Sequence, residues 1–496
     1  MTNSTLPPRK NIIPDIVFLI LITILALSVH GFHYGIEDEA TYLPKIKKYL
    51  DPSLYPFDSA FFQFQSITIY PALIGLLTRV TFLPLAWVVF IVHLLSIFLV
   101  LMACLRLSRK CFDDAKAQWA AVAMVGALLT LPVAGTALYL MDQHLHPRSL
   151  ATAAVLWSLS ELLEARYYKA GGGFLIALLI HPMVGGLGVA FAAFLLWQSS
   201  KQLLLFCLTP LLLLLLPFDL RAPSASWHEA ASVSTQLYLL RWKWYEWIGI
   251  FVPLAMLIWF GYLGRRDGLK VLQRLSWRLT IFGIFFFIMA VVLTIPARFE
   301  RAVLFEPMRS LHLVYLALFM FAGGFMGKWI LRDRPARWLI LFAPLCILMF
   351  LLQRQLFPAS PHIELPGITR KNEWLEAFEW IRQNTPRDAK FALDPDYLAS
   401  RGLDYHGFRG LAERSMLADR IKDRAVMNMA PALTEIWFEQ VKAREGWKDF
   451  RSEDFQRLKR DFGVNWIVVE NRGAANPAAG LDCPHRNGTV SVCKID

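Results

Sequence analysis

Three consecutive carboxylates, at residues 37–39, stand within the stretch HYGIEDEATY. A carboxylate beside a bound substrate can act as general base and take the proton from an attacking hydroxyl group. The three acids directly follow an apolar run, Ile12 to Val29, that is typical of a membrane-spanning helix. Ionisable groups at the edge of a membrane are costly and point to a functional site, although a solvated loop is the simpler alternative. The candidate catalytic residues are Asp38, Glu39 and Glu37.

Two later loops add basic and imidazole groups that are expected on the same side of the membrane. One is MDQHLHPRS, residues 141–149, and the other is ARFERAVLFEPMRS, residues 297–310. Arginine binds phosphate oxygens through two parallel hydrogen bonds, so these loops could hold a phosphate leaving group while a carboxylate activates the acceptor. The same arginines could instead be interface anchors that contact lipid phosphates without specificity. The candidate substrate-binding residues are Arg301, Arg309, Arg298, Arg148, Asp142, His144 and His181.

A divalent metal is a second possibility for the acidic and imidazole groups of the first two outer loops. Carboxylate oxygens and imidazole nitrogens are common metal ligands. The pattern Asp-x-His-x-His at residues 142–146 is short, however, and arises often by chance. We therefore assign no metal ligand and no certain cofactor, and solvated loop histidines are the simpler interpretation.

The composition indicates an integral membrane protein. Of the 496 residues, 56% are hydrophobic and 18% are charged, which is too little charge to cover a soluble chain of this length. The net charge is +12, yet residues 355–496 are neutral, with 21 basic and 21 acidic residues. The basic excess therefore lies in short loops between apolar runs. This pattern predicts a lipid bilayer as partner and argues against a nucleic-acid partner.

The loops also predict the orientation of the chain. Arg9 and Lys10 precede the first apolar run, and cytoplasmic loops are enriched in Lys and Arg, so we expect a cytoplasmic N-terminus. The later basic clusters can all be cytoplasmic if the chain is an α-helical polytopic protein with about eleven transmembrane helices. The expected spans are 12–31, 84–105, 118–140, 149–163, 172–182, 184–198, 202–218, 246–262, 279–296, 310–328 and 338–354.

Two segments depart from simple crossings. Residues 67–82 are apolar but short, which favours an interfacial helix within the first outer loop, residues 32–83. Residues 172–198 would reverse the orientation of all later loops if they formed one span. We expect a break at His181–Pro182, because proline interrupts helical hydrogen bonding, and His181 then lies below the outer surface. One kinked span with a packed histidine is the alternative.

The last part of the chain has the composition of a soluble domain. We expect a transmembrane domain over residues 1–354 and a small α/β domain over residues 355–496, outside the membrane. Cys483 and Cys493 flank an Asn-Gly turn signal, and in an oxidising compartment they could form a disulfide that closes a hairpin. The expected elements are a helix over 372–386 and strands over 390–396, 465–471 and 490–495.

The arrangement resembles the GT-C superfamily of polytopic membrane glycosyltransferases, which includes protein O-mannosyltransferases and the aminoarabinose transferase of lipid A. Asp38-Glu39 followed by Tyr42 is similar to the motif in which members place the catalytic carboxylate. Asp142 falls where some members carry a second acidic residue, and residues 297–310 resemble the arginine-bearing loop near the donor phosphate. The stretch from EWIRQNTPRDAKFALDP to FRGLAERSMLADR is similar to an uncharacterised bacterial branch. The chain lacks the Trp-Trp-Asp-Tyr-Gly stretch of the oligosaccharyltransferases, which argues against protein N-glycosylation.

The sequence and this resemblance together predict an inverting glycosyltransferase in a bacterial inner membrane, with its C-terminal domain in the periplasm. The donor would be a polyprenyl-phosphate-linked sugar, and the acceptor a glycan, lipid or protein on the outer face. Asp38 is the preferred general base, with its two acidic neighbours as alternatives, and Arg301 and Arg309 are the preferred phosphate ligands. The alternative is a non-catalytic transporter or envelope-glycan assembly protein, which the break in 172–198 favours because discontinuous helices line transport sites.

Overall fold

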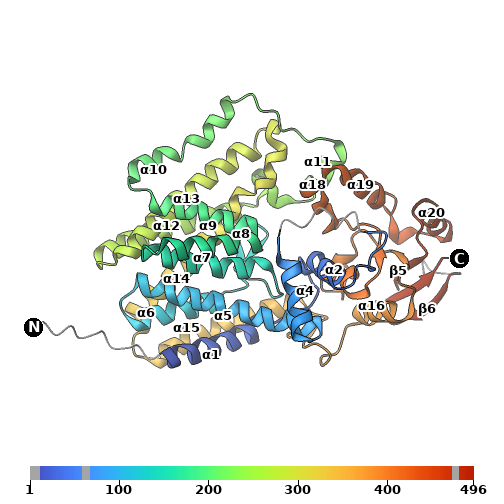
Figure 1. Ribbon diagram of the computed structural model, residues 1–496, viewed down its shortest axis with the longest axis horizontal. Coiled ribbons are helices and arrows are strands. Elements are labelled where there is room, and N and C mark those ends of the chain that lie inside the picture. Colours follow the sequence, from blue (N-terminus) through green and yellow to red (C-terminus); the bar gives the residue numbers. More distant parts are fainter. Residues whose placement is uncertain (1–11, 59–67, 472–479, 496) are drawn as a thin grey trace, which may run out of the picture.

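The computed structural model describes residues 12–58, 68–471 and 480–495. Its first part is a bundle of helices, and the described residues after α15, called the C-terminal part below, form a small sheet flanked by helices at one end of that bundle (Figure 1). The main helices of the bundle are α1 (Ile12–His30), α5 (Leu85–Cys111), α6 (Ala115–Ala127), α7 (Pro147–Leu163), α8 (Tyr167–Ile180), α9 (Pro182–Leu196), α12 (Trp244–Arg266), α13 (Lys270–Thr294), α14 (Leu311–Met326) and α15 (Pro335–Leu356).

Within the described residues, six helical stretches are long and apolar enough to cross a membrane: α1, α5, α12, α13, the stretch Ala297–Leu331 that contains α14, and α15. Only 6% of the most apolar window of α15 is buried inside the protein, so most of its apolar side chains are exposed. A large exposed apolar surface of this kind is stable against lipid and unfavourable in water. The chain is therefore a largely helical membrane protein, and the number of eleven crossings stays a prediction.

Two of the expected spans are interrupted in the structure. α6 ends at Ala127 instead of continuing to residue 140, because Pro132 and Gly135, which has a φ of 63°, turn the chain into a short antiparallel hairpin. The 13 residues of α6 rise only about 20 Å, less than a ~30 Å hydrocarbon core. A proline likewise divides the run expected over 202–218. The short elements in these places are β1 (Pro132–Val133), β2 (Leu138–Tyr139), α10 (Ser200–Phe206) and the 3-10 helix η1 (Thr209–Leu215).

The segment 172–198 is broken at His181, as the charges of the loops predict. α8 ends one residue before His181, whose backbone is extended (φ −149°, ψ 93°), and α9 begins at Pro182. The two helices fold back on each other as a hairpin, with Gly185 of α9 against the backbone of Leu178 in α8. A Cβ atom at position 185 would lie 2.5 Å from the Leu178 nitrogen, so this close packing requires glycine.

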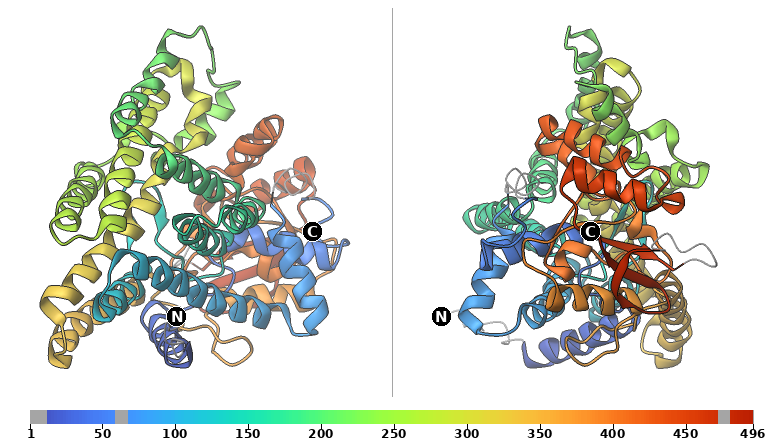
Figure 2. Two further views of the ribbon diagram at one scale, coloured as in Figure 1. Left: turned by 60° about the vertical axis from the view of Figure 1, so that its left-hand side comes forward. Right: turned by 90° about the vertical axis from the view of Figure 1, so that its right-hand side faces the viewer.

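The segment between α1 and α5 contributes two helices to the junction between the bundle and the C-terminal part, α2 (Glu39–Leu50) and α4 (Tyr70–Thr81) (Figures 1 and 2). α4 packs on α2 through Gly75, which lies against the ring of Tyr49. α4 exposes Leu76 and Val80, and Phe82 after its end is 91% exposed. The structure describes the segment expected as an interfacial helix, residues 67–82, from residue 68, and it contains a short helix there. Its position at a membrane interface stays a prediction.

The C-terminal part contains a five-stranded mixed sheet in the order β4-β3-β5-β7-β6. β4 and β5 pair with β3 in parallel, whereas β7 is antiparallel to both β5 and β6. Side chains of the central strand β5 alternate, so that Val468 packs with α16 while Ile467 and Val469 pack with α20. A disulfide joins Cys483 in β6 to Cys493 in β7. The elements are α16 (Glu373–Asn384), β3 (Lys390–Ala392), α17 (Phe408–Ala412), β4 (Ser415–Met416), α18 (Val426–Met429), α19 (Thr434–Lys442), α20 (Ser452–Phe462), β5 (Trp466–Glu470), β6 (Asp482–Arg486) and β7 (Val490–Lys494).

The close approach at Gly185 gives a direct test of the α8–α9 hairpin. Replacing Gly185 by alanine forces the two backbones apart, and overpacking of this kind costs about 1–3 kcal/mol. We expect a lower thermal unfolding midpoint for Gly185→Ala than for the wild type in detergent. Gly186→Ala is the matched control, because a Cβ atom there meets nothing within 4 Å. Equal midpoints for the two variants would contradict the hairpin.

Candidate active site

The segment between α1 and α2 is held in place by three distant parts of the chain. Backbone hydrogen bonds of 2.8 to 3.0 Å join residues 32–35 to residues 362–364 after α15, to residue 143 before α7, and to residue 407 of the C-terminal part. Gly35 has a φ of 81°, a backbone conformation that glycine adopts without strain. This turn directs the chain into α2, so the three acids of residues 37–39 lie where these parts meet.

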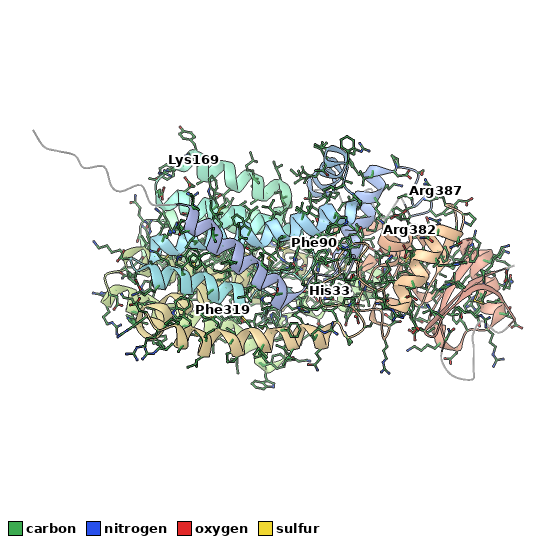
Figure 3. The ribbon with its side chains drawn as sticks, turned by 90° about the horizontal axis from the view of Figure 1, so that it is seen from below. His33, Phe90, Lys169, Phe319, Arg382 and Arg387 are labelled. Atoms are coloured by element: carbon green, nitrogen blue, oxygen red, sulfur yellow. A yellow bond between two sulfur atoms is a disulfide. The ribbon has the colours of Figure 1, made fainter. Side chains whose placement is uncertain are left out.

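A buried carboxylate, Glu364, stabilises this meeting point. It accepts hydrogen bonds from His33 Nδ1 at 2.9 Å and from His406 Nε2 at 3.1 Å. Both imidazoles are fully buried, and His33 lies between the helical bundle and the C-terminal part in Figure 3. Burial alone would raise the pKa of Glu364, but the charge of His406 and the two hydrogen bonds lower it to about 2. Burial would lower the pKa of His406, and the carboxylate instead raises it.

The three adjacent acids have three different environments. Glu39 is fully buried, and one of its oxygens accepts from the Gly35 N–H while the other has no hydrogen-bond partner among the described residues. Burial raises the pKa of Glu39 to about 8, a shift that the Gly35 N–H opposes and the charge of Glu364 increases, so this side chain is mostly neutral at pH 7. Glu37 and Asp38 each lie 2.9 Å from the ammonium group of Lys422.

Asp38 lies between this cation and an imidazole. Its second oxygen is 3.3 Å from His146 Nε2. The backbone N–H of Arg148 donates to His146 Nδ1, so in the neutral ring the proton is on Nε2, directed at Asp38. Burial would raise the pKa of Asp38, but the charge of Lys422 and the His146 hydrogen bond lower it well below its usual range. Burial and the charge of Arg148 lower the pKa of His146. The pair is therefore an ionised carboxylate and a neutral imidazole at pH 7.

Two arginines with anchored guanidinium groups lie near this pair. Arg148 is buried, and one of its terminal nitrogens is 2.6 Å from each oxygen of Asp142. Burial would raise the pKa of Asp142, but the charge of Arg148 lowers it to about 2. Arg309, in the 3-10 helix η5 (Pro307–Ser310), pairs with Glu306 three residues before it. Both guanidinium groups are thus held before any ligand arrives, which reduces the entropy lost on binding an anion.

A cavity of about 410 Å³ is formed between the bundle, α2 and the C-terminal part, and these groups line it. Its lining contains five basic and two acidic side chains, so the space is net positive and suits an anionic ligand. Apolar side chains, among them Ile180, Leu237 and Leu304, line it as well. Burial lowers the pKa of one of the basic groups, Lys45, to about 7. The charged and imidazole side chains of the lining are Asp38, Lys45, His146, Arg148, His181, Glu306, Arg309, Lys422 and Arg424.

A larger cavity, of about 630 Å³, lies on another side of α2. It contains none of the three acids, and its lining has four basic and four acidic side chains. Several of these groups already pair with each other, as Lys47 with Glu413 and Lys371 with Glu379. The larger cavity therefore lacks both the excess positive charge and the ionised acid beside an imidazole, and we assign the candidate site to the 410 Å³ cavity.

The structure brings four of the residues singled out in the sequence into this cavity, namely Asp38, Arg148, His181 and Arg309. Asp142 lies behind Arg148, and His144 is buried with neither ring nitrogen hydrogen-bonded within the described residues. His181 caps the N-terminus of α9, and its ring centroid is 5.7 Å from that of His146.

Arg298 and Arg301 do not line the cavity. Both belong to the 3-10 helix η4 (Ala297–Phe305), which precedes η5. Arg298 donates to the Leu214 carbonyl and lies over the ring of Phe299, and Arg301 is exposed. Arg301 is three residues after Arg298 and eight before Arg309. This spacing could not show which arginine faces the cavity, because it does not reveal the 3-10 geometry that directs Arg309 inward.

The site also contains cations that were not expected from the sequence, Lys45, Lys422 and Arg424. Lys422 is 384 residues from Asp38 along the chain, and it stands in a stretch of mixed charge, RIKDR at residues 420–424, that looks like a solvated loop. The one available signal was the outer acidic stretch itself, since buried or half-buried acids require a counter-charge. That requirement predicts a partner without identifying it.

A divalent metal does not fit these carboxylates as they are arranged. Asp142 is bound on both oxygens by Arg148, and Asp38 is bound by Lys422. Among residues 12–58, 68–471 and 480–495, no group of three or more His, Cys, Asp or Glu side chains could hold a metal ion. We therefore derive no step through a metal.

Comparisons with known proteins cover the fold and a short part of the chain. A domain of unknown function, DUF6798, matches residues 372–435, a stretch that includes His406, Lys422 and Arg424. No curated protein matches the chain. Among solved structures, the chain is similar to the archaeal oligosaccharyltransferase AglB from Archaeoglobus fulgidus, in complex with an inhibitory peptide and a dolichol-phosphate. The match covers 92% of this chain and 69% of that one, with 13% identity and a TM-score of 0.44. Similarity at this level says nothing of the reaction, so the site rests on its own geometry.

The Glu364 cluster gives a stability prediction with a defined pH window. The ordinary pKa values are 4.5 for Glu364 and 6.5 for His406, and the folded values are lower and higher, respectively. The ionised Glu364 therefore stabilises the fold above about pH 4.5, and this contribution is lost as the pH falls toward 2. The contribution of protonated His406 is lost as the pH rises through its raised pKa. We expect Glu364→Gln to cost about 3 kcal/mol or more near pH 5.5.

The measurement is thermal unfolding of both proteins in detergent from about pH 3 to pH 8. The difference between wild type and Glu364→Gln should be largest near pH 5.5 and smaller at both ends. Glu379→Gln is the control, because this partly exposed side chain pairs with Lys371 and Arg382 at the surface, where ion pairs contribute less than about 1 kcal/mol. A difference that does not vary with pH would contradict the ionic role of Glu364.

Proposed function

We propose that this protein is an inverting GT-C-type glycosyltransferase of a bacterial inner membrane, which transfers a sugar from a polyprenyl-phosphate donor to a hydroxyl acceptor on the outer face. The single observation that carries the proposal is the 410 Å³ cavity, in which one ionised carboxylate, Asp38, shares a positively charged space with Arg148 and Arg309. A base and a phosphate-binding pair in one cavity are the two requirements for this reaction.

Donor binding would use the charge and the apolar side chains of the cavity together. The phosphate would bind Arg148 and Arg309, whose guanidinium groups are positioned by Asp142 and Glu306. A polyprenyl tail needs an apolar path, and the apolar lining at Ile180 leads to the α8–α9 hairpin within the bundle. The arrangement suits an amphiphile with a compact anionic head, and it offers little to a neutral water-soluble sugar.

The transfer would be a single displacement. The acceptor oxygen forms a bond to the anomeric carbon, and the bond from that carbon to the phosphate oxygen breaks, so the polyprenyl phosphate leaves with the electron pair. The hydroxyl proton moves to Asp38. The low pKa of Asp38 makes it a weak base toward a free hydroxyl, so proton transfer would accompany bond formation, when the hydroxyl becomes acidic. Attack opposite the leaving group inverts the anomeric configuration.

The alternative is a transporter or assembly protein that binds the same lipid-linked sugar without reaction. The break between α8 and α9 is the observation that favours it, since interrupted helices line transport sites. The two hypotheses differ in their product. The test uses vesicles that contain the protein, a radiolabelled polyprenyl-phosphate sugar and an envelope extract as the source of acceptor hydroxyl groups. An enzyme transfers the label to an acceptor and releases polyprenyl phosphate, whereas a transporter moves unaltered lipid between leaflets.

Substitution of the acids tests the assignment of the base. Asp38→Asn should lower the transfer rate by about 10²-fold or more, the usual contribution of a positioned general base. Glu39→Gln should keep most of the activity, because Glu39 lies outside the cavity and is mostly neutral at pH 7, so the amide resembles it. Transfer is measured with a lipid extract that carries radiolabelled polyprenyl-phosphate sugars. Wild-type rates for Asp38→Asn would exclude it as the base.

Substitution of the arginines tests the phosphate site. Arg309→Leu removes a charged hydrogen-bond donor to the phosphate, so KM for the donor should rise about tenfold or more. Arg301→Leu is the matched control, because it removes the same charge from the same loop outside the cavity, and its KM should change less than about twofold. Binding of farnesyl phosphate, measured by calorimetry, should weaken in the same order. Equal effects of the two substitutions would contradict the phosphate site.

A further inference from the structure

One cation of the candidate site comes from the C-terminal part. Lys422 Nζ lies 2.9 Å from Asp38 Oδ1 and 2.9 Å from Glu37 Oε2. The side chain of Lys422 is 17% exposed, so its charge is poorly screened by water. Burial would lower the pKa of Lys422, but the charges of Asp38 and Glu37 raise it, and the ammonium group stays charged. The contact joins the start of α2 to a loop of the C-terminal part, outside the helical bundle.

The loop that carries Lys422 is stabilised by hydrogen bonds between its own side chains and its own backbone. Asp419 Oδ1 accepts the backbone N–H groups of Ile421 and Lys422, at 2.8 and 2.5 Å. Asp423 Oδ2 in turn accepts the backbone N–H of Asp419 at 2.8 Å. These side-chain bonds close the turn on both sides of Lys422, so its backbone position is fixed without help from a ligand.

A buried ion-pair network connects this loop to the first outer loop. Arg409 Nη1 lies 2.7 Å from Asp423, and Arg409 Nε lies 2.6 Å from Asp58, which is buried eight residues after the end of α2. Asp58 also accepts the backbone N–H of Met416 at 3.0 Å. Removing one member of such a buried network leaves an uncompensated charge, so the network resists opening. Lys422 is therefore attached to the same outer loop whose acids it contacts.

We propose that Lys422 is a positioning residue of the candidate active site, which holds the Asp38 carboxylate in place and ionised against the cavity. Lys422 occupies one lone pair of Oδ1 and His146 faces Oδ2, and each carboxylate oxygen has a second lone pair that can accept the proton of an acceptor. The inference rests on the proposed function, and it makes the C-terminal part a component of the catalytic site.

Other groups around Asp38 do not replace Lys422. Glu37, Asp142 and Glu306 add negative charge near it, and they favour its protonation. Arg148 and Arg424 add positive charge, but Arg148 is bound to Asp142 and Arg424 to Ser234. His144 and His146 have lowered pKa values, largely through burial, and the pKa of Tyr42 is raised, so all three are neutral at pH 7. Without Lys422, Glu37 and Asp38 would lose the cation that lies in direct contact with both carboxylates.

The test measures the protonation of Asp38 without relying on turnover. A hydrophobic carbodiimide modifies protonated carboxyl groups, and mass spectrometry of the full-length protein in detergent locates the adduct. At pH 5 we expect Lys422→Met to increase modification of Asp38 at least about tenfold over the wild type, since an opposite charge at this distance shifts a carboxyl pKa by about 1–3. Lys422→Arg keeps the charge and should restore wild-type modification. Lys422→Gln is made alongside, so a folding defect of one neutral variant leaves the comparison intact.

Arg420→Met is the matched control. Arg420 is two residues away on the same loop, but it pairs with Asp396 at 2.9 Å and does not line the cavity. Its substitution should leave modification of Asp38 and the pH profile of transfer unchanged. In Lys422→Met the acidic limb of that profile should move to higher pH, because Asp38 must be ionised to act as base.

The outcomes separate this inference from the proposed function. Greater modification of Asp38 in the neutral Lys422 variants, in a protein that transfers no sugar, supports the role of Lys422 and excludes the transferase. Transfer by the wild type, with equal modification in Lys422→Met and Arg420→Met, overturns the role of Lys422 and leaves the transferase in place.

Discussion

The contact of Glu364 with His33 and His406 is the constraint on which the candidate site depends. A carboxylate this deeply buried must be paired, because an uncompensated charge there costs several kcal/mol. Its two partners come from the segment after α1 and from the C-terminal part, so satisfying one charge draws both segments to the end of α15. The backbone bond between Gly35 and Gly407 follows from that approach, and with it the position of Asp38 opposite Lys422. The ion pair between Asp38 and Lys422 therefore depends on the buried cluster of Glu364, His33 and His406.

Neighbouring acids acquire different protonation states from this arrangement. Glu39 and Asp38 are adjacent in sequence, yet the pKa of Glu39 is raised by burial away from any cation while Lys422 and His146 lower that of Asp38. The start of α2 separates them, because consecutive residues of a helix point about 100° apart and so face different surroundings. Glu39 is then a neutral hydrogen-bond acceptor in the protein interior, and Asp38 is a charged group of the cavity. The neutral state of Glu39 avoids the repulsion that two ionised carboxylates at adjacent positions would cause.

Local patterns predicted the elements well, and long-range pairing limited the prediction of the site. The apolar run of α1, the break at His181–Pro182, the alternation of β5 and the Asn-Gly turn before β7 are each specified by residues close in sequence. The early end of α6 was missed because Pro132 and Gly135 stand in an otherwise apolar run, where hydropathy outweighs two turn residues. Lys422 was missed for another reason. Nothing near residue 422 indicates that its partner is residue 38, and only the fold of the whole chain brings them together.

The lengths of α8 and α9 bear on where the cavity would lie in the predicted topology. These helices contain 14 and 15 residues, so each rises about 21 to 23 Å, less than a ~30 Å hydrocarbon core. In the predicted topology the break between them would lie below the outer surface of the membrane. His181 lines the cavity at this break. In the proposed function, a phosphate bound by Arg148 and Arg309 would remain close to the apolar helices proposed to hold the lipid tail, and Lys422 and Arg424 would approach it from the C-terminal part. The proposed lipid-linked donor, an amphiphile with an anionic head, would satisfy both surfaces.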